Sequence, residues 1–250
     1  GGDYTHYTSD NNQTLLADYA DGGQSSFSII GGQKIDRYSI YADRKRHLAK
    51  EWNLGYGISY RFAKDRDFQT YDKVTGDIPT ENTDSRLREQ TANFYVSLSR
   101  NYATGTSVSV SATGEYYTIG GYRKWAVYPQ ASLTYVKSPK HLFQLSLSTD
   151  KTYPGYWDMQ SSVSHLNGYT ELWGTPGLKP STTYNLNGNY IWKQKYIFGL
   201  FFMHTSDFFV QTGYQSTDRL ALIYKNTNWN YMQMWGANII LPFKAGNWLD

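Results

Sequence analysis

Large aromatic side chains gathered in one polar stretch are the residues of this sequence best suited to binding chemistry. Five of them lie between residues 151 and 181: Tyr153, Tyr156, Trp157, Tyr169 and Trp173. Aromatic faces stack on sugars, haem-like rings and catechols, and exposed aromatics on loops often mark binding sites. The sequence therefore predicts these five as ligand-binding residues, with packing of the loop against itself as the alternative.

Residues that could carry catalysis are scattered. None of the histidines has the short spacing of a metal site, and there is no Gly-x-Ser-x-Gly motif. His165 is the best placed, because it shares the 151–181 stretch and could pair there with a carboxylate or a serine. The sequence shows no such pairing, so we predict no catalytic residue, no metal site, no cofactor and no enzyme activity. The other histidines are His6, His47, His141 and His204.

Acidic and basic side chains are mixed between residues 64 and 89. The mixture of signs predicts a solvated loop, and a divalent-cation site is the alternative. The carboxylates are Asp65, Asp67, Asp72, Asp77, Glu81 and Asp84, among Lys64, Arg66, Lys73, Arg86 and Arg88.

The elements that must position these residues are β-strands. Between residues 52 and 62 every even position is aromatic or aliphatic, and every odd position is Gly, Ser, Asn or charged. A period of two predicts a strand with one apolar face, and about 11 residues are enough for a tilted strand to cross a bilayer. Lipid on one face and water on the other is the pattern of a transmembrane β-barrel. The side chains expected on the convex side are Trp52, Leu54, Tyr56, Ile58, Tyr60 and Phe62.

The same alternation recurs along the chain, and no stretch of comparable length has a helical period. The predicted fold class is all-β, an antiparallel meander that forms part of a transmembrane β-barrel. Further strands are predicted at residues 37–46, 93–99, 107–116, 125–135, 143–148, 184–192, 195–206 and 230–241.

The predicted connections differ in length. Successive antiparallel strands end on opposite sides, so tight turns should share one rim and long loops the other. Short periplasmic turns and longer outer loops are typical of outer-membrane barrels. Tight turns are predicted at 47–50, 101–105, 138–140 and 193–195, with a further short link at 120–122, and long polar loops at 9–36, 64–89 and 151–181.

Composition supports a barrel wall. Aromatic residues make up 17% of the chain, with 24 Tyr and 8 Trp, as two interfacial girdles require. The mean hydropathy is −0.62, and the sequence has no run of 18 apolar residues, so no transmembrane helix is predicted. A net charge of +3 argues against a nucleic-acid partner. A soluble secreted β-sandwich binding module is an alternative, but its solvated face would carry more Lys and Glu and its strands would be shorter.

Residues 1–250 are interpreted as a single partial β-barrel domain of about 11 strands. An unclosed set leaves strand edges unpaired in lipid, which a membrane does not tolerate. The sequence starts in an alternating stretch at Gly1 and stops at Trp248-Leu249-Asp250, where a new strand would begin. We therefore expect a segment of a larger barrel.

Two elements in the last 100 residues point to a family. Lys151-Thr152-Tyr153-Pro154-Gly155-Tyr156-Trp157 is followed by Trp173-Gly174-Thr175-Pro176-Gly177-Leu178-Lys179-Pro180. This resembles the outer-membrane β-barrel of TonB-dependent receptors, in particular the Bacteroidetes-type outer membrane protein beta-barrel family. There, a Pro-containing loop precedes a Gly-Asn-Pro-x-Leu-x-Pro element that leads into a strand. Thr175 stands where Asn is usual, and Tyr153 where Arg is usual. The matching residues, whose expected role is structural, are Gly174, Pro176, Leu178 and Pro180.

The resemblance implies a receptor that imports a nutrient across the outer membrane of a Gram-negative cell. It implies a barrel of about 22 strands around a plug domain, with TonB, outer-membrane lipid, the nutrient and a surface lipoprotein as partners. The cargo stays open among a glycan, a siderophore, a corrinoid and a peptide. The alternative is a stand-alone outer-membrane barrel, such as a porin, an adhesin, a protease or a lipase.

Overall fold

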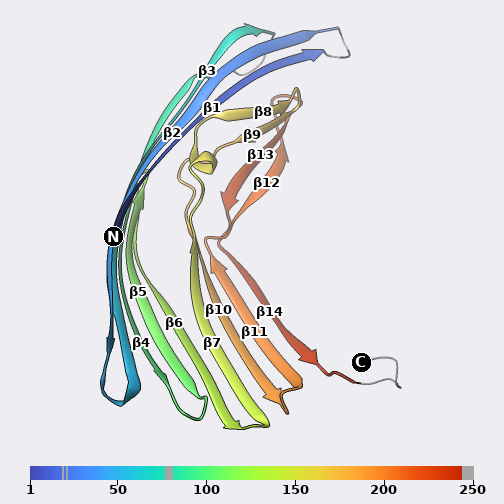
Figure 1. Cartoon of the computed structure of the whole chain (residues 1–250). Helices are drawn as coiled ribbons and strands as arrows, with labels where there is room; N and C mark the ends of the chain where they lie inside the picture. The colour runs from blue at the N-terminus through green and yellow to red at the C-terminus, as the bar shows by residue number, and fades with distance from the viewer. Residues whose placement is uncertain (19, 21, 77–80, 244–250) are drawn as a thin grey trace.

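Ten antiparallel strands form one strongly curved sheet, which we call the wall (Figure 1). The computed structural model describes residues 1–18, 20, 22–76 and 81–243. Neighbouring wall strands follow each other in chain order, apart from two insertions that interrupt the sequence but not the sheet. The wall consists of β1 (Gly2–Asp18), β2 (Gln24–His47), β3 (Trp52–Thr75), β4 (Thr83–Asn101), β5 (Ser107–Ile119), β6 (Tyr122–Ser138), β7 (His141–Thr152), β10 (Ser181–Trp192), β11 (Tyr196–Ser206) and β14 (Tyr231–Ile240).

The two insertions build a second, four-stranded sheet on the concave side of the wall, which we call the inner sheet (Figure 1). The connection from β7 to β10 contributes β8 (Val163–Asn167) and β9 (Thr170–Trp173). The connection from β11 to β14 contributes β12 (Phe209–Gln215) and β13 (Leu222–Asn228). The strand order is β12-β13-β9-β8, and β9 pairs with β13 in parallel.

Helices are minimal, as the all-β prediction requires. The described residues contain two 3-10 turns of three residues each, η1 (Ala49–Glu51) and η2 (Trp157–Met159). In that part of the chain no helix has the length and apolar character to cross a membrane. The wall has ten strands, against the count of about 11 expected from the sequence.

The tight turns lie on one rim, as predicted. They join β2 to β3, β4 to β5, β6 to β7 and β10 to β11, at the lower end in Figure 1. The β5–β6 link and both insertions lie at the opposite rim. Gly120 and Gly121 form that link with φ values of +52° and +89°, the left-handed pair that a two-residue hairpin turn needs.

Two of the three predicted long loops are wrong. Residues 9–36 belong mostly to β1 and β2, which pair from Gly2↔Ile40 to Asp18↔Gln24. Residues 64–89 continue β3 to Thr75 and start β4 at Thr83, so the wall strands run well past the apolar stretch. The 151–181 stretch is a connection, but it is folded, with η2, β8 and β9 inside it.

The charged residues between 64 and 89 therefore do not lie in a solvated loop. They alternate between the convex and the concave face of β3 and β4. On the convex side, the Arg66 guanidinium makes two hydrogen bonds to Asp84, at 3.0 and 2.9 Å. On the concave side Asp65 is buried and accepts a hydrogen bond from Gln33 at 2.9 Å. Burial raises the pKa of Asp65 to about 6. Among the described residues no group of three or more His, Cys, Asp or Glu side chains suits a metal ion, and Asp77 lies outside the described residues.

The two faces of the wall separate as the alternation predicts. In β3, Gln69 on the concave face donates to the Val163 carbonyl of the inner sheet at 2.8 Å, so the even positions point to the convex side. Ile58, at 59% exposure, and Tyr56 and Tyr60 are exposed there. The strand register extends this face across the wall, in the row Leu54, Leu98, Val110, Ala131, Leu147, Leu186, Phe202 and Trp235.

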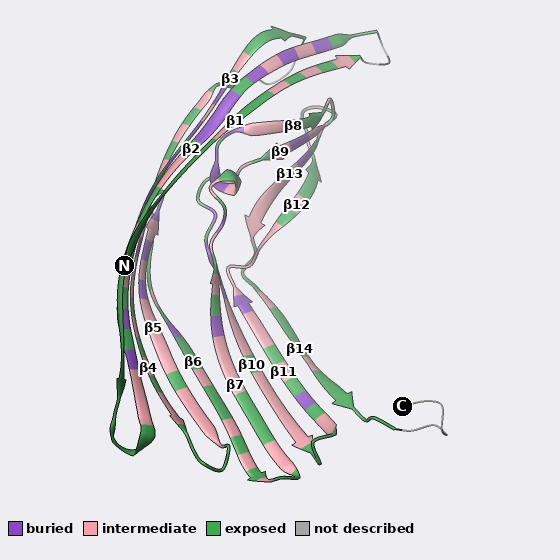
Figure 2. Ribbon diagram, viewed as in Figure 1, coloured by how far each residue is buried: buried purple, intermediate pink, exposed green. Residues whose placement is uncertain are grey.

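The core lies between the wall and the β7–β10 connection, away from the tight-turn rim. Tyr117 and Ile119 from β5 pack with Met159 and Leu178 from the connection, and all four are buried. Figure 2 shows the buried residues of β2 gathered in its upper half, near the inner sheet. The buried hydrophobic core of the wall thus lies where the insertions cover its concave face.

Candidate functional site

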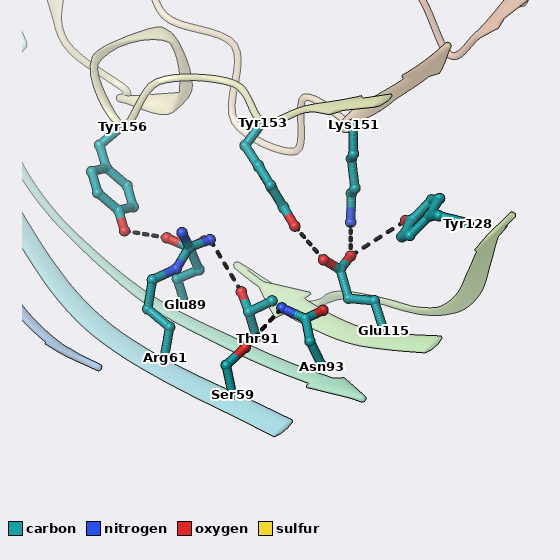
Figure 3. A network of polar contacts seen from close by, with 10 residues as sticks. All are labelled: Ser59, Arg61, Glu89, Thr91, Asn93, Glu115, Tyr128, Lys151, Tyr153 and Tyr156. Atoms are coloured by element: carbon teal, nitrogen blue, oxygen red, sulfur yellow. Dashed lines mark hydrogen bonds and ion pairs between the residues drawn. The ribbon is translucent and has the colours of Figure 1, made fainter. Parts of the chain in front are cut away.

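Two carboxylates on the concave face hold the β7–β10 connection in place (Figure 3). The first is Glu115 on β5. It accepts hydrogen bonds from the Tyr153 hydroxyl and from Tyr128, the latter at 3.3 Å, and it forms an ion pair with Lys151. Lys151 Nζ also lies 4.2 Å from the centre of the Tyr117 ring, a cation–π contact. These three partners offset the free-energy cost of removing the Glu115 carboxylate from water.

The second carboxylate is Glu89 on β4. It accepts a hydrogen bond from the Tyr156 hydroxyl and pairs with Arg61 on β3 at 3.0 Å. Arg61 Nη2 lies 3.3 Å from Thr91 Oγ1, and its guanidinium lies 5.3 Å from the centre of the Tyr153 ring. Five wall strands, β3 to β7, and the connection are therefore joined by one network of charge-assisted bonds, which fixes the segment from Lys151 onward.

A histidine joins the inner sheet to the upper wall. His165 on β8 is 3% exposed, and its ring lies 4.7 Å from that of Phe27 on β2. Its Nε2 is 3.0 Å from the Tyr71 hydroxyl, and its Nδ1 is 3.5 Å from Glu171, which also binds Arg219. Burial lowers the pKa of His165, outweighing the opposing effect of Glu171.

The Gly174 to Pro180 segment closes the connection and leads into β10. A Cβ at Gly174 would collide with the Gln160 carbonyl oxygen, so the close approach of two backbones requires glycine here. Gly177 has φ +84° directly after Pro176, as in a type II turn, and the Leu178 N–H donates to the Thr175 carbonyl at 3.2 Å. Leu178 is 1% exposed within the core.

Thr175 ties this segment to the other insertion. Its hydroxyl donates to the Asn226 carbonyl of β13 at 2.6 Å, and its N–H donates to the Asp158 carbonyl of η2, also at 2.6 Å. The Asn226 side chain in turn donates to Asp158 Oδ1 at 2.8 Å. The two insertions are therefore held together through the threonine that replaces the usual asparagine.

The five aromatic residues predicted to bind ligand fall into two groups. Tyr153 and Tyr156 point toward the wall and hold the connection to Glu115 and Glu89 (Figure 3). Trp157, Tyr169 and Trp173 are exposed at 41%, 44% and 36%. The assignment of all five as ligand-binding residues stays a prediction. Tyr153 and Tyr156 have a supporting role in the structure, whereas the other three rings are exposed on its surface.

Trp157 and Trp173 line one small polar cavity between η2 and the inner sheet, together with Gln160, Gln211 and Asn226. Its free space of about 40 Å³ is close to the volume of a single water molecule, about 30 Å³. The cavity therefore has room for no more than one small polar group. Trp173 is oriented by its indole N–H, which donates to Glu171 at 2.7 Å.

Sequence reasoning missed the residues that position this site. Arg61 and Glu115 are single charges within otherwise small-polar or aromatic stretches, and that was the available signal. Glu89 and Lys151 carry no such signal, because they lie beside Arg88 and Asp150. A charge on the lumen-facing side of a strand needs a partner when it is covered. The partners come from a connection far along the chain, so spacing alone does not identify them.

Comparison with solved structures identifies the fold. The chain is similar to the siderophore receptor PirA from Pseudomonas aeruginosa, with a TM-score of 0.57 and 13% identity over 97% of this chain and 48% of that one. It is similar to the Serratia marcescens hemophore receptor HasR, crystallised as a double mutant with hemophore HasA and heme, with a TM-score of 0.56 and 8% identity over 95% and 46% of the two chains. A mutant of the Pseudomonas aeruginosa ferric enterobactin receptor PfeA, bound to enterobactin, matches with a TM-score of 0.53 and 13% identity over 98% and 39%.

The chain thus spans less than half the length of these solved receptors. No match was found among curated proteins. The profile of the outer membrane protein beta-barrel family matches residues 1–250, the whole chain. The curved meander, its two-faced strands and this match agree: the chain belongs to the outer membrane protein beta-barrel family and lies in the outer membrane of a Gram-negative cell.

Proposed function

We propose that the chain forms part of the barrel of a TonB-dependent receptor that imports a nutrient. The observation that carries the proposal is the pair of insertions folded on the concave side at the rim opposite the tight turns. They are fixed to the wall through Glu89, Glu115 and His165. A fixed inner sheet offers a preorganised surface to a ligand that arrives from outside the cell.

The ligand surface in this proposal is formed by Trp157, Tyr169 and Trp173, with Tyr153 and Tyr156 as their supports. The exposed rings offer flat apolar faces, and the polar cavity beside Trp157 and Trp173 offers hydrogen-bond partners. A few polar groups among aromatic rings are typical of small-molecule sites. The solved receptors of similar fold take siderophores or a hemophore according to their names, which supports a cargo with a conjugated ring or a catechol.

The proposal includes a larger barrel around a plug, with TonB as the partner that supplies energy. The coverage of 39% to 48% of the matched receptors supports it. A catalytic role is disfavoured, because the one histidine–carboxylate pair among the insertions, His165 with Glu171, is buried and its Nε2 is taken by Tyr71. In this proposal the chain is a transport element and not an enzyme.

The test is a binding and uptake screen on the intact receptor. Ferric enterobactin, haem, cyanocobalamin and maltohexaose are titrated against the purified protein, and uptake is measured with and without a protonophore. For the cargo that binds, Trp157→Ala and Trp173→Ala should each weaken binding about tenfold or more, as loss of a stacked aromatic does. Trp125→Ala on the convex face, where the ring is 75% exposed, is the matched control. Uptake that persists in full with the protonophore would contradict a TonB-dependent receptor.

A further inference from the structure

An apolar groove crosses the convex face of the wall over β6, β7, β10, β11 and β14. It has a volume of about 650 Å³, within the roughly 300–1,000 Å³ of ordinary ligand pockets. Its outward-facing lining includes Leu133, Leu145, Gly188, Leu200 and Ala237, which the register places in one row across five strands. The groove exists because this row has a glycine and an alanine where the row above it has Leu186 and Trp235.

Gly188 is not required by the backbone. A Cβ there would meet only Leu145 Cδ1, at 3.8 Å, which is an ordinary van der Waals contact, and its φ is not in the left-handed region. Glycine inside a strand weakens the strand and often marks the close approach of another molecule. The recess at Gly188 is therefore open to a molecule other than this chain.

A row of stacked aromatic rings borders the groove on the side of the tight-turn rim. Tyr135 and Phe143 are 6.2 Å apart, Phe143 and Tyr190 4.9 Å, and Tyr190 and Phe198 6.1 Å, with interplanar angles of 21° to 28°. Aromatic rows of this kind lie at the membrane–water interface. The groove therefore begins at the interface and runs into the hydrocarbon layer of the leaflet next to the tight turns.

The two turns below this row form a basic platform. The Lys193 N–H donates to the Lys140 carbonyl at 2.7 Å, which joins the β10–β11 turn to the β6–β7 turn. Lys193 Nζ lies 4.6 Å from the Trp192 ring centre, and Lys195 Nζ lies 5.7 Å from that of Tyr196. Residues 137–141 and 192–196 contain four lysines and no carboxylate, and no ion pair to a described residue neutralises them.

We propose that the groove and the platform together bind one phospholipid with an anionic headgroup. An acyl chain fills the recess at Gly188, and the phosphate region lies against Lys140, Lys193 and Lys195. The leaflet follows from topology, because tight turns are periplasmic and the periplasmic leaflet of an outer membrane consists of phospholipid. Charge complementarity selects the anionic class, since each surface lysine adds to the attraction of an anionic lipid.

The experiment titrates two lipids onto the intact receptor in detergent and counts retained lipid by native mass spectrometry. The probes are dioleoylphosphatidylglycerol and dioleoylphosphatidylcholine, which share their acyl chains and differ in net charge. Wild-type protein should retain phosphatidylglycerol preferentially. Lys193→Gln with Lys195→Gln should reduce that preference about fivefold per lysine. Gly188→Leu, which fills the recess from the convex side, should reduce retention of both lipids.

Matched controls keep the outcome interpretable. Lys50→Gln removes a cation from the β2–β3 turn on the same rim, and Val110→Leu enlarges a side chain on the same face away from the groove; neither should change retention. Heat-modifiable gel mobility confirms that each variant is folded. Equal retention of the two lipids by wild-type protein, or unchanged retention in folded Gly188→Leu, would overturn the proposal and indicate ordinary annular lipid. Neither result bears on nutrient import.

Discussion

The Tyr71 hydroxyl on β3 lies 3.0 Å from Nε2 of His165 on β8, so a wall strand and the inner sheet meet at a titratable ring. His165 is buried against Phe27, and Gln13 on β1 contacts its backbone carbonyl. Three wall strands therefore converge on one residue of the inner sheet. The docking of that sheet is tied to the protonation of a single imidazole.

The contact at His165 should weaken in mild acid. Burial lowers the pKa of His165 below its ordinary 6.5, so both docked and undocked states are neutral above that value. As the pH falls below about 6.5, the undocked state takes up its proton first and is favoured. Amide hydrogen exchange in residues 163–173 should be faster at pH 5.5 than at pH 7.5, after correction for intrinsic exchange rates.

His165→Asn provides the control for that measurement, because asparagine is polar but does not titrate. Asp65 has the opposite effect on stability. Because its pKa is raised to about 6 in the folded state, protonation of Asp65 stabilises the folded state as the pH falls toward 6. The difference between wild-type protein and His165→Asn isolates the histidine. An identical pH dependence of exchange in both proteins would show that a group other than His165 causes the effect.

Charge on the two faces of β5 should have unequal effects. Val110 is 55% exposed on the convex face, and Val110→Arg would place a guanidinium in hydrocarbon, at about 2–4 kcal/mol. Ser109→Arg, one residue away, faces the interior and should destabilise little. The measurement is folding of the intact protein into lipid vesicles, followed by heat-modifiable mobility and urea titration. Equal losses for the two variants would mean that these faces are not lipid and lumen.

Removal of the Tyr156 hydroxyl should loosen the β7–β10 connection. Tyr156→Phe keeps the ring but takes one donor from Glu89, which is buried, at about 1–3 kcal/mol. Limited proteolysis should then cut residues 153–180 faster, while the wall stays intact. Tyr135→Phe removes a hydroxyl on the convex face and should leave the cleavage rate unchanged; acceleration by both variants would argue for a global effect.

Gly174→Ala should disrupt the end of the same connection. The added Cβ meets the Gln160 backbone, which cannot move without breaking the contact between η2 and the Thr175 segment. We expect a loss of about 1–3 kcal/mol in local stability, as for other forced overpacking. Gly188→Ala, whose Cβ makes only an ordinary contact, is the matched control. Equal proteolytic resistance of the two variants would refute the close-approach argument.

The alternation of residues 52–62 predicted its strand and its faces correctly, because the lipid that selects those side chains is present on one side along the whole segment. The same strand was missed beyond Phe62. There Lys64 and Arg66 face water while Asp65 is buried on the concave side beside Gln33, so both faces are polar and the period of two disappears. The part of the strand that extends beyond the membrane therefore has no hydrophobic pattern by which the sequence could reveal it.

The candidate site was likewise predicted only in part from the sequence. The predicted 151–181 loop is the β7–β10 connection, and two of its five aromatic residues, Tyr153 and Tyr156, have the packing role that the sequence left open as the alternative. Which rings are supports and which are exposed depends on Glu115 and Glu89, which lie 38 and 67 residues away from Tyr153 and Tyr156. The inner sheet was missed altogether, since its strands are short and β9 pairs with β13 across the two insertions.

The parallel pairing of β9 with β13 also has a consequence for the order of folding. Thr170 pairs with Leu222, although the complete β10–β11 hairpin lies between them in the chain. Hairpins of the wall close over short loops, whereas this pairing requires both insertions to be synthesised and the strands between them to be in place. The inner sheet should therefore form last, after the wall has entered the membrane. Defects in β9 or β13 would therefore leave the wall intact while the proposed binding surface stays unformed.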